Sequence, residues 1–355
     1  MRSITWLTSA EMERLSMAHG YAAEPVLPPN VLEGWIFSPE QELSALQLYV
    51  NDEGVAYVPL WDRPDVAAVY PRFPHAVRSG YHLMLPSGLL RGNRVNQVTV
   101  VGFHDGEARV RKKTLVFDDD LAPAVPIPPP ELIKRTQGDE DGVLYRKLGY
   151  LFYREMLDLL AKYRDPQSIR RVLDWGCGSG RVAANFLADA QKYEVHACDP
   201  HPESIAWCQA HLPAGRFRVS PGQPPLPYAD TSFDLVLALG VVYLFSHDEL
   251  LAWLAELKRI LAKRGILILT IQGAFAAKVR FPPEALALLQ RDGVLDADRA
   301  DAGTGAAADA KLYRKGYFWK PAYIKEMASR HFRVHDYQEG AFTSDHDLII
   351  AERVD

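Results

Sequence analysis

The spacing of apolar residues divides the chain into two parts with different periods. Between residues 34 and 117, short apolar runs alternate with polar positions and are separated by turn residues, which is the pattern of half-buried strands. From residue 143 onward, stretches with apolar positions three and four apart alternate with short, almost wholly apolar runs. That pattern predicts helices alternating with strands. The sequence therefore predicts an all-β part followed by an α/β part.

Two hairpins are expected in the first part. Strand-like runs flank the turn Asn51–Gly54 and, further on, the pair Asp105-Gly106. Asp-Gly between alternating runs is a strong hairpin signal, because a tight hairpin turn needs positive φ at its central residues. The whole region has room for about seven short strands, which fits a β-sandwich. We therefore expect an all-β sandwich domain over residues 1–117.

Residues 118–142 separate the two parts. This stretch is acidic, rich in proline and free of apolar periodicity. Proline fixes φ and removes a backbone donor, so such a stretch is typical of a semi-rigid connector. We predict a linker here, followed by a second domain over residues 143–355.

The second part shows the features of a doubly wound α/β sheet. The runs "SFDLVLAL" and "ILILTI" have almost no polar face, as parallel strands buried on both sides require. Between them, "DELLAWLAELKRILAKRG" predicts a helix with Gly265 at the favoured position just past its end. Residues 292–312 are small, polar and rich in Gly and Ala, which predicts a loop or insertion suited to a substrate lid.

Composition narrows the class of protein. The net charge is -5 and the isoelectric point is about 6.1, which argues against a broad nucleic-acid-binding face. The three cysteines are odd in number and fit no zinc spacing, so we expect reduced thiols, a reducing compartment and no metal. No apolar run is long enough for a secretion signal or a membrane span. A cytoplasmic protein without membrane span or nucleic-acid partner is expected.

One short stretch carries the clearest chemistry: "VLDWGCGSGRVA", residues 172–183. A strand leads into Asp174 and then into glycines at 176, 178 and 180. A dinucleotide fingerprint would need its third glycine at position 181, which is Arg181, and no Gly-Lys-Ser/Thr ending of a phosphate-binding P-loop follows. A carboxylate at this place suits a cation better than a pyrophosphate.

A ligand with an α-ammonium group, a carboxylate and a sulfonium would match this loop, and a ribose on the same ligand would match the next strand end. Asp174 can attract the ammonium, and loop amides at a helix N-terminus can hold the carboxylate. Asp199 ends the next strand, 25 residues later, where a carboxylate can accept hydrogen bonds from both ribose hydroxyls. The alternative is that Asp199 caps the helix that starts near Pro202. The ligand with these groups is S-adenosylmethionine.

The motifs "VLDWGCGSGR", "ACDP", "LPYADTSFDLVLALGVVYLF" and "LAELKRILAKRGILILTI" resemble, in order and spacing, those of class I S-adenosylmethionine-dependent methyltransferases from about residue 170 to 271. The resemblance implies a Rossmann-like, doubly wound, seven-stranded sheet of order 3-2-1-4-5-7-6 with the last strand antiparallel. It also implies a set of cofactor-binding residues: Asp174, Gly176, Cys177, Gly178, Gly180, Asp199, Pro200, Gln223 and Leu239.

One position departs from the family pattern. Where the family often has Asp or Asn near the adenine amino group, this chain has Gly222-Gln223. Either Gln223 contacts the adenine or only the backbone does.

The methyl acceptor is less constrained by the sequence. A hydroxyl acceptor needs a base, and Tyr243 and His247 follow the fourth strand of the resemblance, although a core or capping role is equally compatible with each. His201, His346 and Asp347 are further candidates, the last two at the start of the final strand.

The N-terminal part resembles β-sandwich modules that accompany bacterial glycan and envelope enzymes. This implies a saccharide, glycan or glycolipid hydroxyl as acceptor, a role in polysaccharide biosynthesis and association with glycan-assembly enzymes. Its aromatic residues Trp35, Tyr49, Trp61, Tyr70 and Tyr81 are either core residues or a sugar-stacking face. Two alternatives stay open: an N- or C-methyltransferase for a small metabolite, and a non-catalytic scaffold that binds a partner through the sandwich.

Overall fold

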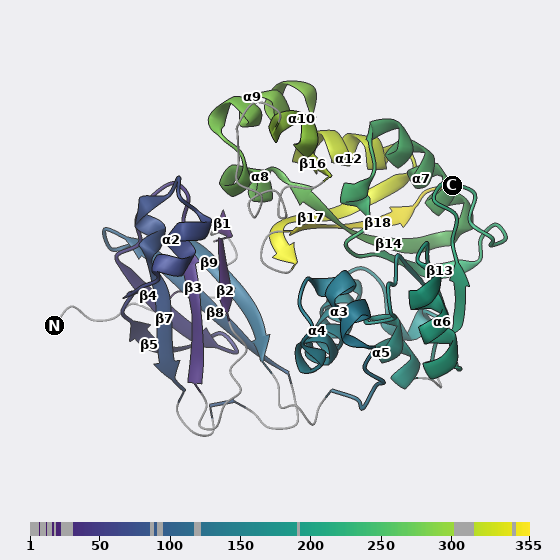
Figure 1. The fold of residues 1–355 in the computed structure, drawn as a ribbon, viewed down its shortest axis with the longest axis horizontal. Coiled ribbons are helices and arrows are strands. Elements are labelled where there is room, and N and C mark those ends of the chain that lie inside the picture. The colour runs from purple at the N-terminus through teal and green to yellow at the C-terminus, as the bar shows by residue number, and fades with distance from the viewer. Residues whose placement is uncertain are drawn as a thin grey trace. The chain divides into compact units, whose positions relative to one another are not determined.

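The computed structural model describes residues 7, 12, 16–17, 19–22, 31–85, 89–90, 95–116, 122–189, 192–301, 316–342 and 346–355. The chain groups into two compact units (Figure 1). Unit 1 contains residues 1–121 together with 275–281 and 339–346, and unit 2 contains the remainder. Two short segments of the range predicted for the second domain therefore group with the N-terminal part. For residues 275–281, the packing partners are apolar residues of the N-terminal part.

Unit 1 is built from two sheets that share one hydrophobic core. The five-stranded sheet has the order β1-β9-β8-β4-β5 and the four-stranded sheet the order β2-β3-β7-β6. Leu32 and Ile36 of one sheet and Leu46 and Leu48 of the other belong to the same buried cluster. The strands are β1 (Ser16–Met17), β2 (His19–Ala22), β3 (Val31–Phe37), β4 (Ala45–Val50), β5 (Glu53–Val58), β6 (Trp61–Asp62), β7 (Arg78–Met84), β8 (Asn96–His104) and β9 (Glu107–Val116).

Both expected hairpins form in unit 1. Strands β4 and β5 pair through a turn in which Asn51 and Asp52 have φ of 50° and 66°, and β8 and β9 pair through Asp105 and Gly106, with φ of 49° and 80°. Two consecutive positive φ angles match the twist of the flanking strands.

A second apolar cluster explains why residues 275–281 group with unit 1. Phe37, Val66 and Ala76 pack with Val279 of helix α8 (Ala274–Arg280). The other partners lie on β3, on helix α2 (Pro64–Val69) and on the 3-10 turn η1 (Pro74–Val77). Polar contacts add to the packing, since the Lys278 carbonyl accepts from Arg72 Nη2 at 3.2 Å.

The range predicted as a linker contains a helix. Helix α3 (Pro130–Gln137) lies within residues 118–142, and its Leu132 and Ile133 are buried. Proline at the first helical position and Gly138 at φ 91° after the last turn are favoured helix boundaries. The prolines here therefore start a helix instead of excluding one, and residues 118–121 of the range lie outside the described residues.

Within the residues that the structure describes, unit 2 contains a nine-stranded mixed sheet instead of the seven strands expected. Strands β12-β11-β10-β13-β14 are parallel neighbours, β18 pairs antiparallel with β14, and β17 pairs with β18. The extra strands arise because β14 continues beyond Ile271, where Gln272 and Gly273 pair with β16, and β16 pairs with β15. The strands are β10 (Arg171–Trp175), β11 (Glu194–Asp199), β12 (Arg216–Val219), β13 (Phe233–Ala238), β14 (Leu261–Gly273), β15 (Val294–Asp296), β16 (Tyr317–Trp319), β17 (Phe332–Phe342) and β18 (His346–Arg353).

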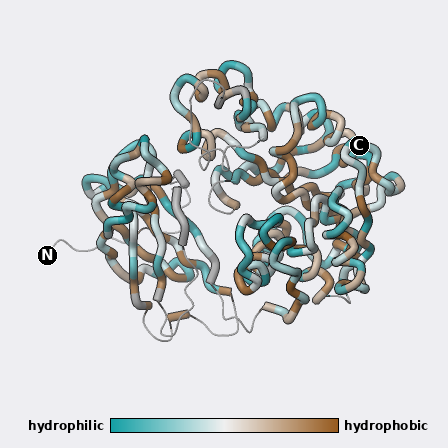
Figure 2. The backbone as a smooth tube through the Cα atoms, viewed as in Figure 1, coloured by the Kyte–Doolittle hydropathy of each residue, from teal (hydrophilic) through white to brown (hydrophobic). Residues whose placement is uncertain are grey.

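The helices of unit 2 connect or flank the strands of this sheet along the chain. They are α3, α4 (Gly142–Leu160), α5 (Ala183–Ala188), α6 (Pro202–His211), α7 (His247–Ile260), α9 (Pro283–Asp292), α10 (Ala297–Asp301) and α12 (Pro321–Ser329), with the 3-10 turns η3 (Pro166–Ser168) and η4 (Val242–Leu244). Residues of the central strand β13, such as Leu235, Val236 and Leu237, are fully buried. Brown, hydrophobic segments run through the interior of this unit in Figure 2. None of the helices within the described ranges is long and apolar enough to cross a membrane.

Two local predictions in unit 2 were wrong. Helix α7 ends at Ile260 and not at Gly265, because the fully buried Leu261 already pairs with Phe233 as the first residue of β14. Part of the 292–312 stretch is regular, since β15 and α10 occupy residues 294–301 and Leu295 is buried. Residues 302–312 of the expected lid lie outside the described residues.

Candidate functional site

The three glycines after β10 all have backbone conformations that favour glycine. Gly176, Gly178 and Gly180 have φ of 79°, 52° and 79°. A Cβ on Gly176 would lie 2.2 Å from Val241 Cγ2, and a Cβ on Gly180 would lie 2.8 Å from Leu212 Cδ1. The loop therefore combines left-handed φ with close packing at both ends, which only glycine accommodates without strain.

We expect Gly176→Ala to destabilise the protein by about 3 kcal/mol, since positive φ at a residue with a Cβ and overpacking both cost free energy. Gly222→Ala is the matched control, because no heavy atom of the described residues, apart from its two chain neighbours, lies within 4 Å of its Cβ position. Urea unfolding followed by circular dichroism measures both, and equal midpoints for Gly176→Ala and the unmodified protein would contradict the strain argument.

Asp174 is a buried carboxyl at the end of β10. It is 3 % exposed, and its Oδ2 accepts a hydrogen bond from the Ala183 amide at 3.1 Å. Burial raises the pKa of Asp174 to about 7, with a smaller upward contribution from Asp199, while the Ala183 amide and Arg181 act in the opposite direction. A carboxyl balanced near neutrality in this way ionises readily when a cationic group is placed beside it.

Asp199 lies at the end of the neighbouring strand and holds the glycine loop. Its Oδ2 accepts from the Gly178 amide and its Oδ1 from the His201 amide, both at 2.9 Å. The alternative interpretation, that Asp199 caps α6, is wrong: the N-cap is His201, whose side chain accepts from the Ser204 amide. The structure thus brings Asp174, the glycine loop and Asp199 together through the pairing of β10 with β11.

Most amides of the loop already have protein acceptors. Gly176 and Cys177 donate to the Cys198 carbonyl at 2.8 and 3.2 Å, and Gly180 donates to the Cys177 carbonyl at 2.9 Å. With Gly178 bound to Asp199, four of the amides expected to hold a ligand carboxylate are engaged within the protein. A carboxylate bound here would therefore need other donors near the loop.

Arg181 and helix α3 were not among the residues expected at the site. The Arg181 guanidinium lies 4.9 Å from the Phe152 ring and 5.9 Å from the Tyr145 ring, and Arg181 Nε is buried without a hydrogen-bond partner among the described residues. Thr136 of α3 lies beside the loop, with Oγ1 3.2 Å from a Cβ position on Gly178. The sequence signal for α3 was its proline start and glycine end, which the acidic, proline-rich composition obscured.

The remaining predicted cofactor residues differ in their exposure to solvent. Cys177 is buried, and burial raises the pKa of its thiol well above the usual range, so it stays a thiol. Pro200 and Gln223 are exposed, and Leu239 is partly buried after β13. All three cysteines are free and buried.

Tyr243 and His247, the candidate catalytic residues, follow β13 in the chain. Tyr243 is in η4, where its carbonyl oxygen lies 2.1 Å from a Cβ position on Gly316. His247 is the first residue of α7, and its Nδ1 lies 2.9 Å from Asp248 Oδ1. Because β10 and β13 are parallel, this connection and Asp174 lie at the same edge of the sheet. Over the ranges described, no cluster of three or more His, Cys, Asp or Glu side chains could hold a metal ion.

One curated protein resembles part of the chain in sequence. A malonyl-[acyl-carrier protein] O-methyltransferase of Halorhodospira halophila is 33% identical over 125 residues, which is 34% of this chain and 41% of that relative. The chain thus spans about two fifths of the length of this curated relative.

Two solved structures resemble the chain at low identity. They are a SAM-dependent methyltransferase from Methanosarcina mazei (15% identity, TM-score 0.42, covering 55% of this chain and 97% of that one) and the N-methyltransferase NodS from Bradyrhizobium japonicum with S-adenosyl-L-homocysteine (13% identity, TM-score 0.39, covering 64% and 98%).

The family comparison agrees with the part of the chain that carries the glycine loop. The matched segment runs from β10 to the first residues of β14 and includes both Asp174 and Asp199. Residues 172–265 match the family model described as a methyltransferase domain, which supports S-adenosylmethionine as the cofactor of this segment.

Proposed function

We propose that the protein is an S-adenosylmethionine-dependent O-methyltransferase that acts on a hydroxyl of a saccharide, glycan or glycolipid. The observation that carries the cofactor half of the proposal is the pair of buried carboxyls, Asp174 and Asp199, on either side of a three-glycine loop at the ends of adjacent parallel strands. Ligands of open α/β sheets bind at this edge.

The residues present fit such a cofactor. S-adenosylmethionine, when bound, supplies an electrophilic methyl group. Asp174 is the proposed partner of its ammonium, since a cation beside a buried carboxyl with a pKa near 7 stabilises the charged form of that carboxyl. Asp199 has carboxylate lone pairs beyond the two used by Gly178 and His201, and these can accept from ribose hydroxyls.

The enzyme's further task is to position the acceptor and remove its proton. Proximity and alignment supply much of the rate of an in-line displacement. His247 is partly exposed and lies after β13, so it is the candidate to accept the proton of a hydroxyl acceptor. Tyr243 is the neighbouring candidate for orienting the acceptor.

The support for a sugar acceptor comes from the aromatic residues of unit 1. In unit 1, Tyr49 and Tyr81 are core residues, whereas Trp61 is 59% exposed and Tyr57 45% exposed. Exposed aromatic rings of this kind can stack on sugars. The curated relative is named an O-methyltransferase, which favours an oxygen acceptor but equally supports a second candidate, a carboxyl group on an acyl chain. The N-methyltransferase and scaffold alternatives remain outcomes of the test below.

The test combines binding with product analysis. Isothermal titration with S-adenosylmethionine should show one site, and incubation with methyl-labelled cofactor and envelope glycan extracts should place the label on sugar oxygens. Label found only on amines or on carboxyl groups would reject the saccharide acceptor. Binding without any transfer would favour the scaffold, and absence of binding would overturn the methyltransferase proposal itself.

His247→Gln is expected to lower kcat about 100-fold, the usual contribution of a positioned general base, while the Kd for S-adenosylhomocysteine stays unchanged. Tyr243→Phe, which keeps the ring, serves as the comparison. An unaltered kcat in His247→Gln would show that the residue only begins helix α7.

A further inference from the structure

The connection between β12 and β13, residues 220–232, contains Gln223 and has no regular structure of its own. We propose that Arg259, on helix α7, is the positioning residue that holds this connection against the adenosine end of the cofactor. The inference rests on the proposed function, because it assigns a role within the same cofactor site.

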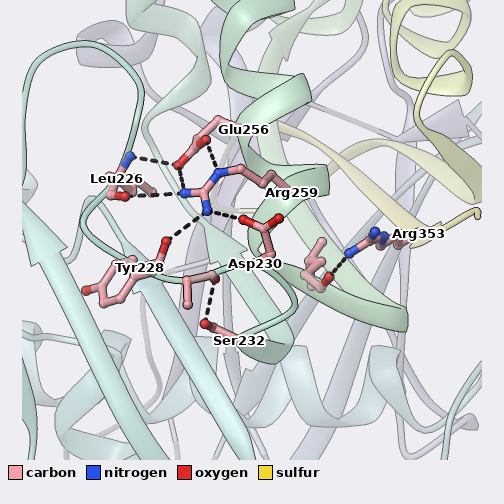
Figure 3. A network of polar contacts seen from close by, with 9 residues as sticks. Leu226, Tyr228, Asp230, Ser232, Glu256, Arg259 and Arg353 are labelled. Carbon is pink, nitrogen blue, oxygen red and sulfur yellow. Dashed lines mark hydrogen bonds and ion pairs between the residues drawn. The ribbon is translucent and has the colours of Figure 1, made fainter.

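Arg259 binds the connection through both terminal nitrogens of its guanidinium, while its Nε binds Glu256 on the same helix (Figure 3). Nη1 donates to the Tyr228 carbonyl at 2.9 Å and to Asp230 Oδ1 at 2.7 Å, and Nη2 donates to the Leu226 carbonyl at 3.3 Å. Nε and Nη2 also donate to the two carboxylate oxygens of Glu256 at 2.8 and 2.7 Å. One side chain therefore holds three residues of the connection at once.

Glu256 completes the attachment from the same helix. Its Oε1 accepts from the Leu226 amide at 2.7 Å, so both backbone polar groups of Leu226 are bound by the Glu256–Arg259 pair. The Arg259 carbonyl accepts from the Thr231 amide at 2.9 Å. The connection is thus fixed along residues 226–231 by α7 instead of by pairing with another strand.

The burial of the partners shows which contacts matter. The side chain of Glu256 is 5% exposed and that of Arg259 is 29% exposed, whereas Asp230 is 73% exposed. A buried carboxylate needs its bidentate partner, since removal of one member leaves a buried charge uncompensated. The exposed Asp230 contact contributes little by comparison. Only arginine has the planar fork that satisfies Glu256 and two carbonyls together.

The other end of the connection meets the residue proposed to bind ribose. The Ser220 amide donates to the Asp199 carbonyl at 3.1 Å. A shift of residues 221–226 would therefore move Gln223 relative to Asp199. The consequence is specific: loosening Arg259 should impair recognition of the adenosine part and leave the Asp174 contact to the ammonium unaffected.

The experiment uses adenosine and S-adenosylhomocysteine as separate probes in isothermal titration of the full chain. Arg259→Lys keeps the charge but loses the fork, so both ligands should bind about 10-fold more weakly, by the same factor, with KM for S-adenosylmethionine raised and kcat retained. Asp230→Asn is the matched control on the exposed side of the same guanidinium, and its two dissociation constants should change less than 2-fold.

Three results would overturn the positioning role of Arg259. Unchanged binding of both probes by Arg259→Lys overturns the positioning role, as does a loss confined to S-adenosylhomocysteine. If Arg259→Lys fails to fold, Glu256→Gln replaces it, because glutamine still accepts from Leu226 while weakening the hold on Arg259, and the same two outcomes apply. If the unmodified chain binds neither probe, the proposed function fails and the inference fails with it.

Discussion

Asp174→Asn is expected to weaken binding of S-adenosylmethionine about 100-fold, the value of a charge-assisted hydrogen bond, and at the same time to stabilise the protein above pH 7. Asparagine keeps an oxygen that can accept from the Ala183 amide, so the backbone contact at the end of β10 survives. What disappears is the buried charge. Loss of binding with a gain in stability would identify a residue selected for its ligand and not for the fold.

The sign of the pH dependence follows from the pKa of Asp174. Its folded value is about 7 and the value for an ordinary aspartate is 3.8, so between these limits the native state holds a proton that the unfolded state has released. Stability of the unmodified protein therefore falls as pH rises from about 4 to about 7, by on the order of 4 kcal/mol. Asp174→Asn lacks this fall, and its advantage should appear above pH 7 and vanish near pH 4.

Thermal unfolding and titration across pH test both halves. Cofactor affinity of the unmodified protein should increase between pH 6 and 7.5 as Asp174 ionises, while that of Asp174→Asn stays level. Asp158→Asn, at an exposed position on α4, is the control for loss of a negative charge. If Asp174→Asn binds the cofactor as tightly as the unmodified protein, Asp174 does not pair with the ammonium.

The parts of the site that could be predicted from sequence are those fixed by local geometry. The glycine spacing at 176, 178 and 180 reflects three positive φ angles. The positions of Asp174 and Asp199 could be predicted because each lies at the end of an apolar run that forms a strand. The resemblance to a methyltransferase, which was stated for residues 170–271, agrees with the family match over residues 172–265.

The parts that could not be predicted depend on partners distant in sequence. The Cys198 carbonyl accepts hydrogen bonds from the amides of Gly176 and Cys177, and no local sequence pattern predicts these bonds. Helix α7 is shortened by the pairing of Leu261 with Phe233, and residues 275–281 join unit 1 through Phe37 and Val66. Glu256 and Arg259 look like an ordinary pair three residues apart on a helix, although their main partners lie about thirty residues earlier.

Asp199→Ala is expected to abolish binding of both adenosine and S-adenosylhomocysteine, by more than 100-fold, and to destabilise the protein by about 3 kcal/mol. The loss of stability follows because the amides of Gly178 and His201 would lose their acceptor at a position that is 7% exposed. The loss of binding follows from two causes at once, a missing ribose acceptor and a glycine loop released from its support.

Binding of adenosine distinguishes the roles of the Asp174 and Asp199 carboxyls. Asp174→Asn should bind adenosine normally because its ligand group is the ammonium, whereas Asp199→Ala should not. Asp199→Asn distinguishes the two causes of the Asp199 effect: its remaining oxygen can hold one amide and restore part of the stability, but its amide nitrogen cannot accept from a hydroxyl. Recovered stability with binding still impaired assigns Asp199 to the ribose. Recovery of both together would mean that Asp199 acts only by holding the loop, and the ribose contact would have to be sought elsewhere at this edge of the sheet.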